Sequence, residues 1–295
     1  MGTQEPHRAT QHLWRWAHGI RFAEKEPEMT APDTKTIDFE LDADWTTLWL
    51  NRPDARNAMS DELVADLRAQ LACIATRADI RGLTIRGRGD AFCAGGDLKG
   101  FKNNFQSERS LEEVIGDSSK MGDFFLAVRS MPQVVVFLLH GAAMAGGLGM
   151  ACAGDIVIAA KATKMGLTET SIGVVPAQIG RYIVERVGEF KARYIMLTAK
   201  RFTAVEGADM GLVDFLVDDV AAAEAVEAEI KADVRRCAPM ANAATKKLLE
   251  HNKVLGAQEM IHYAGELFAE AVKSDEGREG VASFLEKRKP NWTQS

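Results

Sequence analysis

The feature that most constrains the fold is a buried strand followed directly by a glycine-rich segment. Residues 133–139 form a continuous apolar run, rich in valine, which is typical of a strand covered on both faces. Residues 141–154 are rich in glycine and alanine, and a helical pattern begins within them. A sheet that is covered on both faces needs helices on each side, so we predict an α/β protein.

The rest of the chain completes this prediction. Alternating apolar and polar residues indicate a hairpin over 36–50, and Ser60 is suited to cap a following helix. We further predict strands at 80–86 and 155–160, a helix at 111–131, and almost entirely helical structure beyond Pro176. We divide the chain into an N-terminal extension (1–35), an α/β core (36–200) and a helical C-terminal region (201–295).

Composition narrows the class of function. The net charge of −6 argues against general nucleic-acid binding, and no apolar run approaches the length that spans a bilayer. The four cysteines form no C-x-x-C pair, and the six histidines show no spacing typical of metal ligands. We therefore expect reduced thiols in a cytoplasmic protein without a metal. Residues 1–35 read as a disordered or non-native extension, with Met29 as an alternative start and a transit peptide left open.

Three short motifs carry the chemistry. The first is Ala94-Gly-Gly-Asp97-Leu98, where paired glycines allow a sharp turn and a close approach by another molecule. The second is residues 145–149, where free N–H groups at a predicted helix N-terminus would face a ligand. The third places Glu169 between two threonines. Alone, each has an ordinary structural explanation: a turn, close helix packing and a solvated loop.

Together, in this order, the three motifs resemble the enoyl-CoA hydratase/isomerase (crotonase) superfamily over residues 36–295. Further matching segments are Asn51-Arg-Pro, Cys-Ala-Gly-Asp-Ile at 152–156, Met-Gly-Leu-Thr-Glu at 165–169, Ala-Asp-Met-Gly-Leu-Val at 208–213 and the C-terminal residues 283–289. The resemblance implies an α/β spiral of strand-strand-helix units with a helical C-terminal region. It also implies trimers, commonly paired into hexamers.

The resemblance assigns roles to individual residues. The backbone N–H groups of Gly96 and Gly146 would form an oxyanion hole for a thioester enolate, and Glu169 would be the acid/base. Coenzyme A would arrive as part of the substrate, with no further cofactor. Its contacts would come from Ala55, Arg56, Ala58, Ala94, Gly95, Asp97, Leu98, Lys99, Gly147 and Thr168, and, near the nucleotide and in part from a neighbouring subunit, from Phe268, Phe284 and Lys287.

The exact reaction is less constrained, because Gly149 stands where the best-known hydratases have a second glutamate. A single glutamate suffices for double-bond isomerisation, whereas hydration must also orient a water molecule. Residues 175–188 nevertheless resemble branched glutaconyl-CoA hydratases of leucine and acyclic-terpene breakdown, so we rank hydratase first. Isomerase, another crotonase-type reaction (hydrolase, lyase or dehalogenase) and a non-catalytic acyl-CoA-binding homologue are the alternatives. Arg181 is a candidate partner for a distal carboxylate, and a glutamate introduced at position 149 should raise hydration.

Overall fold

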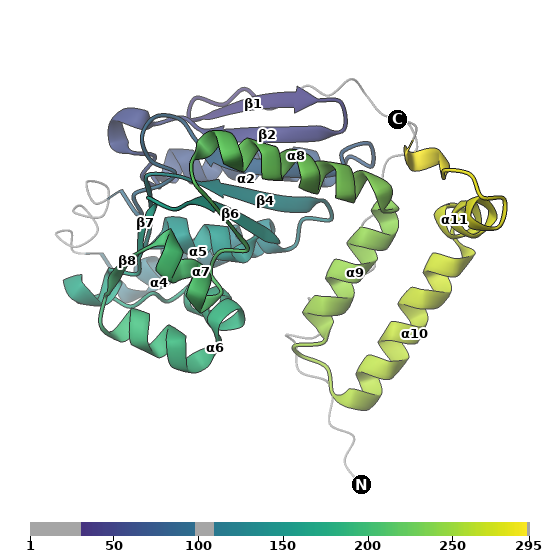
Figure 1. The fold of residues 1–295 in the computed structure, drawn as a ribbon. Coiled ribbons are helices and arrows are strands. Elements are labelled where there is room, and N and C mark those ends of the chain that lie inside the picture. Colours follow the sequence, from purple (N-terminus) through teal and green to yellow (C-terminus); the bar gives the residue numbers. More distant parts are fainter. Residues whose placement is uncertain (1–30, 98–108, 294–295) are drawn as a thin grey trace, which may run out of the picture.

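The structure, a computed structural model, describes residues 31–97 and 109–293. The expected mixed α/β fold is confirmed: a central sheet has helices on both faces, and the C-terminal helices extend away from it (Figure 1). The expected N-terminal extension lies almost wholly outside the described residues.

The central sheet has six strands in the order β1-β2-β3-β4-β6-β9. β1 and β2 form the predicted antiparallel hairpin, in which Ile37 lies opposite Leu50, and each later neighbour pairs in parallel. The strands are β1 (Ile37–Asp42), β2 (Trp45–Leu50), β3 (Gly82–Gly87), β4 (Val134–Leu139), β6 (Ile156–Ala160) and β9 (Phe215–Val217).

β4 is covered on both faces, as its apolar run predicts. Val135 and Phe137 belong to the larger apolar core, whereas Val136 and Leu138 face the smaller core that includes α8 (Val220–Arg236). The larger core receives helices on the other face: α2 (Asp61–Ala75), α4 (Leu111–Arg129), α5 (Gly146–Ala153) and α6 (Gly180–Leu197). α2 begins as predicted, because the Ser60 hydroxyl accepts a hydrogen bond from the Leu63 N–H.

A second, three-stranded sheet has the order β5-β7-β8 and lies at the end of the central sheet where β4 and β6 finish. Its strands are β5 (Ala142–Met144), β7 (Lys164–Gly166) and β8 (Arg201–Thr203), and α7 (Ala204–Met210) follows β8. β8 and β9 both come from the region that was predicted to be almost entirely helical. They are short, so their sequences carry little strand pattern, and pairing with β7 and β6 defines them.

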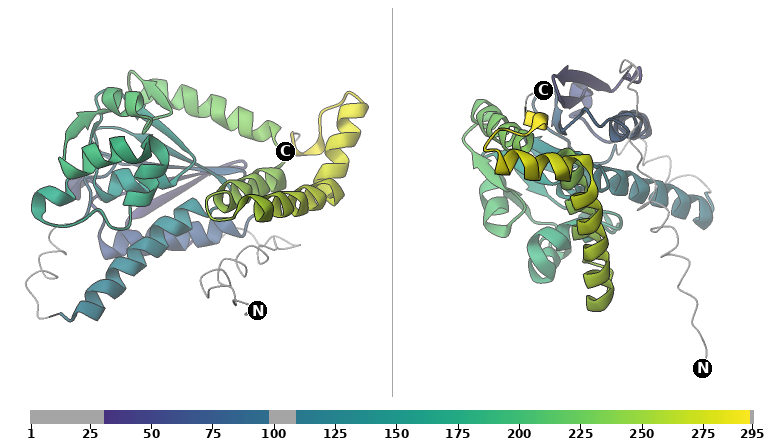
Figure 2. Two further views of the ribbon diagram at one scale, coloured as in Figure 1. Left: turned by 90° about the horizontal axis from the view of Figure 1, so that it is seen from below. Right: turned by 90° about the vertical axis from the view of Figure 1, so that its right-hand side faces the viewer.

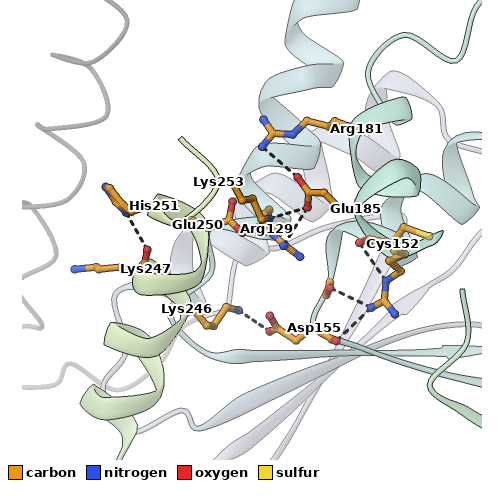
Figure 3. A network of polar contacts seen from close by, with 12 residues as sticks. Arg129, Cys152, Asp155, Arg181, Glu185, Lys246, Lys247, Glu250, His251 and Lys253 are labelled. Atoms are coloured by element: carbon orange, nitrogen blue, oxygen red, sulfur yellow. Dashed lines mark hydrogen bonds and ion pairs between the residues drawn. The ribbon is translucent and has the colours of Figure 1, made fainter. Parts of the chain in front are cut away.

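The C-terminal helices α9 (Pro239–His251), α10 (Ala257–Lys273) and α11 (Asp275–Leu285) project away from the sheets, as Figures 1 and 2 show. No residue of α10 is buried in the single chain. Ion pairs join α9 and the residues after it to the core, and Figure 3 draws them. The Lys246 ammonium lies 2.5 Å from the Asp155 carboxylate, and Arg129 of α4 lies 2.5 Å from Glu250.

Candidate active site

The first glycine segment is held against residues 56–59. The Met59 N–H donates to the Gly95 carbonyl at 2.8 Å, and the Asp97 N–H donates to the Met59 carbonyl at 3.1 Å. In a trans peptide the C=O and the following N–H point in opposite directions. Because the Gly95 carbonyl points at Met59, the Gly96 N–H points away from Met59, toward the opposite side of this segment.

The second glycine segment is the start of α5. The Ala145 carbonyl accepts from the Gly149 N–H at 3.0 Å, which is the first hydrogen bond of the helix. By the same peptide geometry, the Gly146 N–H points out of the helix N-terminus. Both glycines are partly exposed.

The two glycine segments lie side by side. Cys93 and Ala143 form a parallel bridge, with the Cys93 N–H donating to Ala142 and the Met144 N–H donating to Cys93. One step further along, a Cβ placed on Gly95, whose φ is +101°, would lie 3.1 Å from the Ala145 Cβ. The residues immediately preceding Gly96 and Gly146 are therefore in close contact.

The N–H groups of Gly96 and Gly146 have no acceptor within residues 31–97 and 109–293. Buried or half-buried backbone donors normally have partners, so two such groups on adjoining segments are unusual. Ala145 adds a second unusual feature, because its φ of 49° and ψ of −125° are strained for a residue with a Cβ. Strain of this kind concentrates at functional sites, where the surrounding structure holds it in place.

A hydrogen bond connects this strained turn to the segment that carries Glu169. The Ala145 N–H donates to the Gly166 carbonyl at 2.8 Å, at the end of β7. Three residues later Glu169 begins a short 3₁₀ helix (Glu169–Ile172), and the Thr170 hydroxyl anchors that helix by donating to the Met196 carbonyl. Glu169 is thus positioned by the same small sheet as Gly146.

Glu169 is a partly buried carboxyl group. Its Oε2 atom is inaccessible to solvent and has no hydrogen-bond partner in the described part of the chain. Burial raises the pKa of Glu169, and its own backbone N–H opposes that rise only in part. A carboxyl group with a raised pKa is suited to proton transfer near neutral pH.

The position of the missing glutamate is occupied by another side chain. A Cβ placed on Gly149 would lie 2.2 Å from Cγ2 and 2.4 Å from Cβ of Ile179, which is buried just before α6. The space beside Gly149 is therefore filled by Ile179 and is not an open cavity.

The predicted coenzyme A contacts divide into two groups. Ala55, Arg56 and Ala58 lie beside the first glycine segment, and the Ala94 N–H donates to the Arg56 carbonyl at 3.0 Å. Gly147 is buried, and a Cβ there would lie 2.7 Å from the Cys93 Cβ. Leu98 and Lys99 are outside the described residues. The structure does not bring three further residues to the site within one chain, because they lie on or after the projecting helices: Phe268, Phe284 and Lys287.

Arg181, the candidate partner for a distal carboxylate, lies on the exposed surface of α6. Its guanidinium pairs with Glu185 at 3.5 Å, its side chain is 54% exposed, and it lies over the Tyr182 ring. Figure 3 shows Arg181 directed along α6 toward Glu185. It is a surface arginine in an i,i+4 pair.

Sequence reasoning missed two residues, Asn57 and Arg52, whose hydrogen bonds hold the loops around the first glycine segment. The fully buried Asn57 accepts from the Arg52 N–H and donates to the carbonyls of Arg88 and Ala91. Arg52 also pairs with Asp97 at 3.0 Å. The matching segment at Asn51-Arg-Pro contains Arg52, but nothing in the sequence alone indicates that Asn57 joins two distant loops.

The described residues contain neither a cluster of metal-ligating side chains nor a membrane-spanning helix. No group of three His, Cys, Asp or Glu side chains there is arranged to hold a metal ion. None of the described helices has both the length and the apolar character to cross a membrane.

Comparisons with known proteins identify the family. The family described as enoyl-CoA hydratase/isomerase matches residues 44–295. A probable enoyl-CoA hydratase from Bacillus subtilis is 31% identical, over 87% of this chain and 98% of its own length. The 2,3-dehydroadipyl-CoA hydratase of Escherichia coli is 28% identical, over 83% of this chain and 93% of its own.

Solved structures agree. Pseudomonas aeruginosa AtuE is 40% identical, with a TM-score of 0.85 over 88% of this chain and 100% of its own. An enoyl-CoA hydratase/isomerase from Marinobacter aquaeolei is 34% identical, with a TM-score of 0.83 over 88% of this chain and 99% of its own. The chain is therefore an acyl-CoA-processing enzyme that belongs to the enoyl-CoA hydratase/isomerase family.

Proposed function

We propose that this enzyme is an enoyl-CoA hydratase, which adds water across the double bond of an α,β-unsaturated, straight or branched acyl-CoA thioester. The observation that carries the proposal is a pair of N–H groups, at Gly96 and Gly146, that have no acceptor among the described residues and lie on segments in contact. We expect both to donate to the thioester oxygen. Each such donor is worth about 2.7–4 kcal/mol of transition-state stabilisation, because it binds the enolate more strongly than the carbonyl.

In the proposed mechanism Glu169 moves the proton. Its carboxylate accepts a proton from water as the water oxygen bonds to C3, and electrons shift onto the thioester oxygen as the enolate. The protonated carboxyl then delivers a proton to C2, the thioester carbonyl re-forms, and one water has been added. Burial raises the pKa of Glu169, which makes it easier for the carboxylate to accept the proton from water near neutral pH and still deliver it to C2.

Double-bond isomerisation is the second candidate, favoured by the packing at Gly149. Position 149 is a glycine and provides no carboxylate to hold the water, and Ile179 fills the space beside it. An isomerase needs one group that removes a proton from C2 or C4 and returns it to the other carbon, and Glu169 alone can do this.

We propose that the subunits assemble as trimers, paired into hexamers. Large apolar side chains on the C-terminal helices are left exposed in the single chain, which is unfavourable unless they are covered. Examples are Ile261 at 67%, Phe268 at 72% and Phe284 at 82%. Assembly would also bring Phe268, Phe284 and Lys287 to the nucleotide end of a neighbour's coenzyme A. This would make residues 201–295 the region for assembly and pocket completion.

Coenzyme A would enter with the substrate, and we propose no other cofactor. Burial raises the pKa of the Cys93 and Cys152 thiols to about 12, so neither is suited to act as a nucleophile. The four free cysteines support a reducing, cytoplasmic location.

A turnover assay tests the reaction. The protein is incubated with crotonyl-CoA, a branched 2-enoyl-CoA and a 3-enoyl-CoA, while the absorbance of the conjugated thioester is followed. Hydration removes conjugation from the 2-enoyl substrates, whereas isomerisation creates it from the 3-enoyl substrate. If acyl-CoA binds and none of the unsaturated thioesters is converted, the protein is a non-catalytic binder and the proposal is wrong.

A further inference from the structure

The loop beside the first glycine segment contains two consecutive residues with positive φ. Arg56 and Asn57 have φ values of 50° and 54°, in the left-handed region that side chains other than glycine rarely adopt. Asparagine is among the residues enriched in this region, and arginine is not. A turn of this kind persists only where the surrounding structure holds it in place.

The Asn57 carboxamide holds this turn. Its oxygen accepts from the Arg52 N–H at 2.8 Å, and its nitrogen donates to the carbonyls of Arg88 at 2.9 Å and Ala91 at 2.8 Å. Because both N–H groups of the amide are donated, its orientation is fixed. Gly87 leaves the space that the carboxamide uses, since a Cβ placed there would lie 2.8 Å from the Asn57 Nδ2.

The residues on either side of Asn57 bind the segment that contains Gly96. The Arg56 carbonyl accepts from the Ala94 N–H at 3.0 Å. Beyond Asn57, Met59 forms a parallel bridge with Gly96, in which the Met59 backbone bonds the residues before and after Gly96. The conformation of the turn at Asn57 therefore sets where residues 94–97 lie.

This arrangement also sets the direction of the Gly96 N–H. The bridge to Met59 directs that N–H away from Met59, on the peptide geometry described above. A donor stabilises an enolate only when it points at the oxygen, and a displacement of about 1 Å can lower a rate by about a hundredfold. A change of backbone angle at Asn57 would reach Gly96 through the bridge.

We infer that Asn57 is a positioning residue, whose carboxamide fixes the strained turn and thereby aims the Gly96 N–H at the thioester oxygen. Asn57 is fully buried, so it cannot touch the substrate and acts only through the backbone. The inference rests on the proposed function, since it assumes that Gly96 is an oxyanion donor. It adds a buried side chain on which the strength of that donor depends.

Asn57→Gly tests the inference, because glycine adopts positive φ freely and the variant loses only the side chain. For the unsaturated thioester that the wild type converts, kcat should fall by about tenfold to a hundredfold, with little change in KM. A loss of stability alone would not produce this separation of kcat from KM.

An infrared measurement reports the oxyanion donors directly. Hexanoyl-CoA, labelled with carbon-13 at the thioester carbonyl, is saturated and binds without turnover. Hydrogen bonds to the carbonyl oxygen weaken the C=O bond, so binding to the wild type should lower its stretching frequency. Binding to Asn57→Gly should lower that frequency less, because one of the two donors is misdirected.

Gln133→Ala is the matched control. Gln133 is also buried, and its carboxamide nitrogen donates to the carbonyls of Ile74 and Arg77. It lies just before β4, whereas the two glycine segments follow the other ends of β3 and β4. Gln133→Ala should lower the unfolding temperature, as Asn57→Gly should, but leave kcat and the carbonyl frequency unchanged.

The possible results separate this inference from the proposed function. If Asn57→Gly does not fold, Asn57→Asp is measured instead, since it keeps the shape and the bond from Arg52 but neither donation. Unchanged kcat and carbonyl frequency in a folded Asn57 variant would overturn the inference alone, as would the same changes in Gln133→Ala. A wild type that binds hexanoyl-CoA without lowering the carbonyl frequency would overturn the oxyanion hole, and the inference with it.

Discussion

Ile179 occupies the space into which any side chain at Gly149 would extend, with its Cγ2 atom 2.2 Å from an ideal Cβ at that position. Ile179 is buried and β-branched, so it has little freedom to move away from a side chain introduced at position 149. The sequence-based expectation that a glutamate at 149 raises hydration is therefore inconsistent with the packing. Gly149 and Ile179 are packed against each other, so a larger residue at 149 requires a smaller one at 179.

Gly149→Glu alone should consequently lower stability without raising hydration. Overpacking of this kind typically costs about 1–3 kcal/mol, and the buried carboxylate adds to it. Gly149→Glu combined with Ile179→Ala opens the space and should recover part of that stability. Thermal unfolding of both variants and of Ile179→Ala provides the measurement. A fully stable single variant would show that Ile179 moves aside freely.

Glu169→Gln should remove proton transfer and still bind coenzyme A thioesters. General acid–base catalysis is typically worth about 10²–10⁴-fold, so kcat should fall by at least about a hundredfold. Glu229→Gln, at an exposed position of α8, serves as a control for the loss of one carboxylate. Turnover of the variant within a few-fold of the wild type would exclude Glu169 from the mechanism.

The same substitution should change the pH dependence of stability. The pKa of Glu169 is raised by burial, so the folded protein binds this proton more tightly than the unfolded chain does. Above the folded pKa the ionised, buried carboxylate costs stability, and that cost disappears as the pH falls through the raised pKa. Glu169→Gln should therefore unfold at a higher temperature than the wild type near neutral pH, and the difference should shrink at mildly acidic pH. A constant difference would contradict this.

What could be predicted from the sequence was local. The hairpin over β1 and β2 follows from the alternation of apolar and polar residues, the start of α2 from Ser60, and the coverage of β4 from its unbroken apolar run. The two glycine segments could be singled out only as a set of motifs that resembles a family, and the roles of Gly96 and Gly146 remain predictions. What could not be predicted depends on contacts between distant segments. The side chain of Ile179 fills the space at Gly149, and β9 is a strand because it pairs with β6.

Gly146→Pro should test the second proposed oxyanion donor with little damage to the helix. Position 146 is the first residue of α5, where proline is tolerated because the N–H has no helical partner. Losing one oxyanion donor typically lowers kcat by about 10²–10³-fold. Gly146→Ala is the matched control, since it keeps the N–H and its Cβ meets only the flexible end of Met59. Equal activity of the two variants would show that this N–H does not contribute.

Lys246→Met should weaken the attachment of the C-terminal helices to the core. The Lys246 ammonium donates to the Asp155 carboxylate (Figure 3), and it also donates to the Gln133 carbonyl, at the junction between α9 and the sheet. Burial lowers the pKa of Lys246, although Asp155 opposes this shift, so the pair is largely withdrawn from water. Removing one partner leaves Asp155 without its cation, which should cost about 3 kcal/mol in the free energy of unfolding.

Lys253→Met is the comparison, because Arg129 also holds both of its partners, Glu185 and Glu250. Its loss should therefore cost clearly less than that of Lys246. Lys246→Met combined with Asp155→Asn removes both charges and should recover much of the stability that the single variant loses. Chemical denaturation of the three variants measures these differences. If Lys253→Met lowered the free energy of unfolding as much as Lys246→Met, the buried Lys246–Asp155 pair would not be the main contact that attaches α9 to the core. The overall charge between α9 and the core would then be responsible.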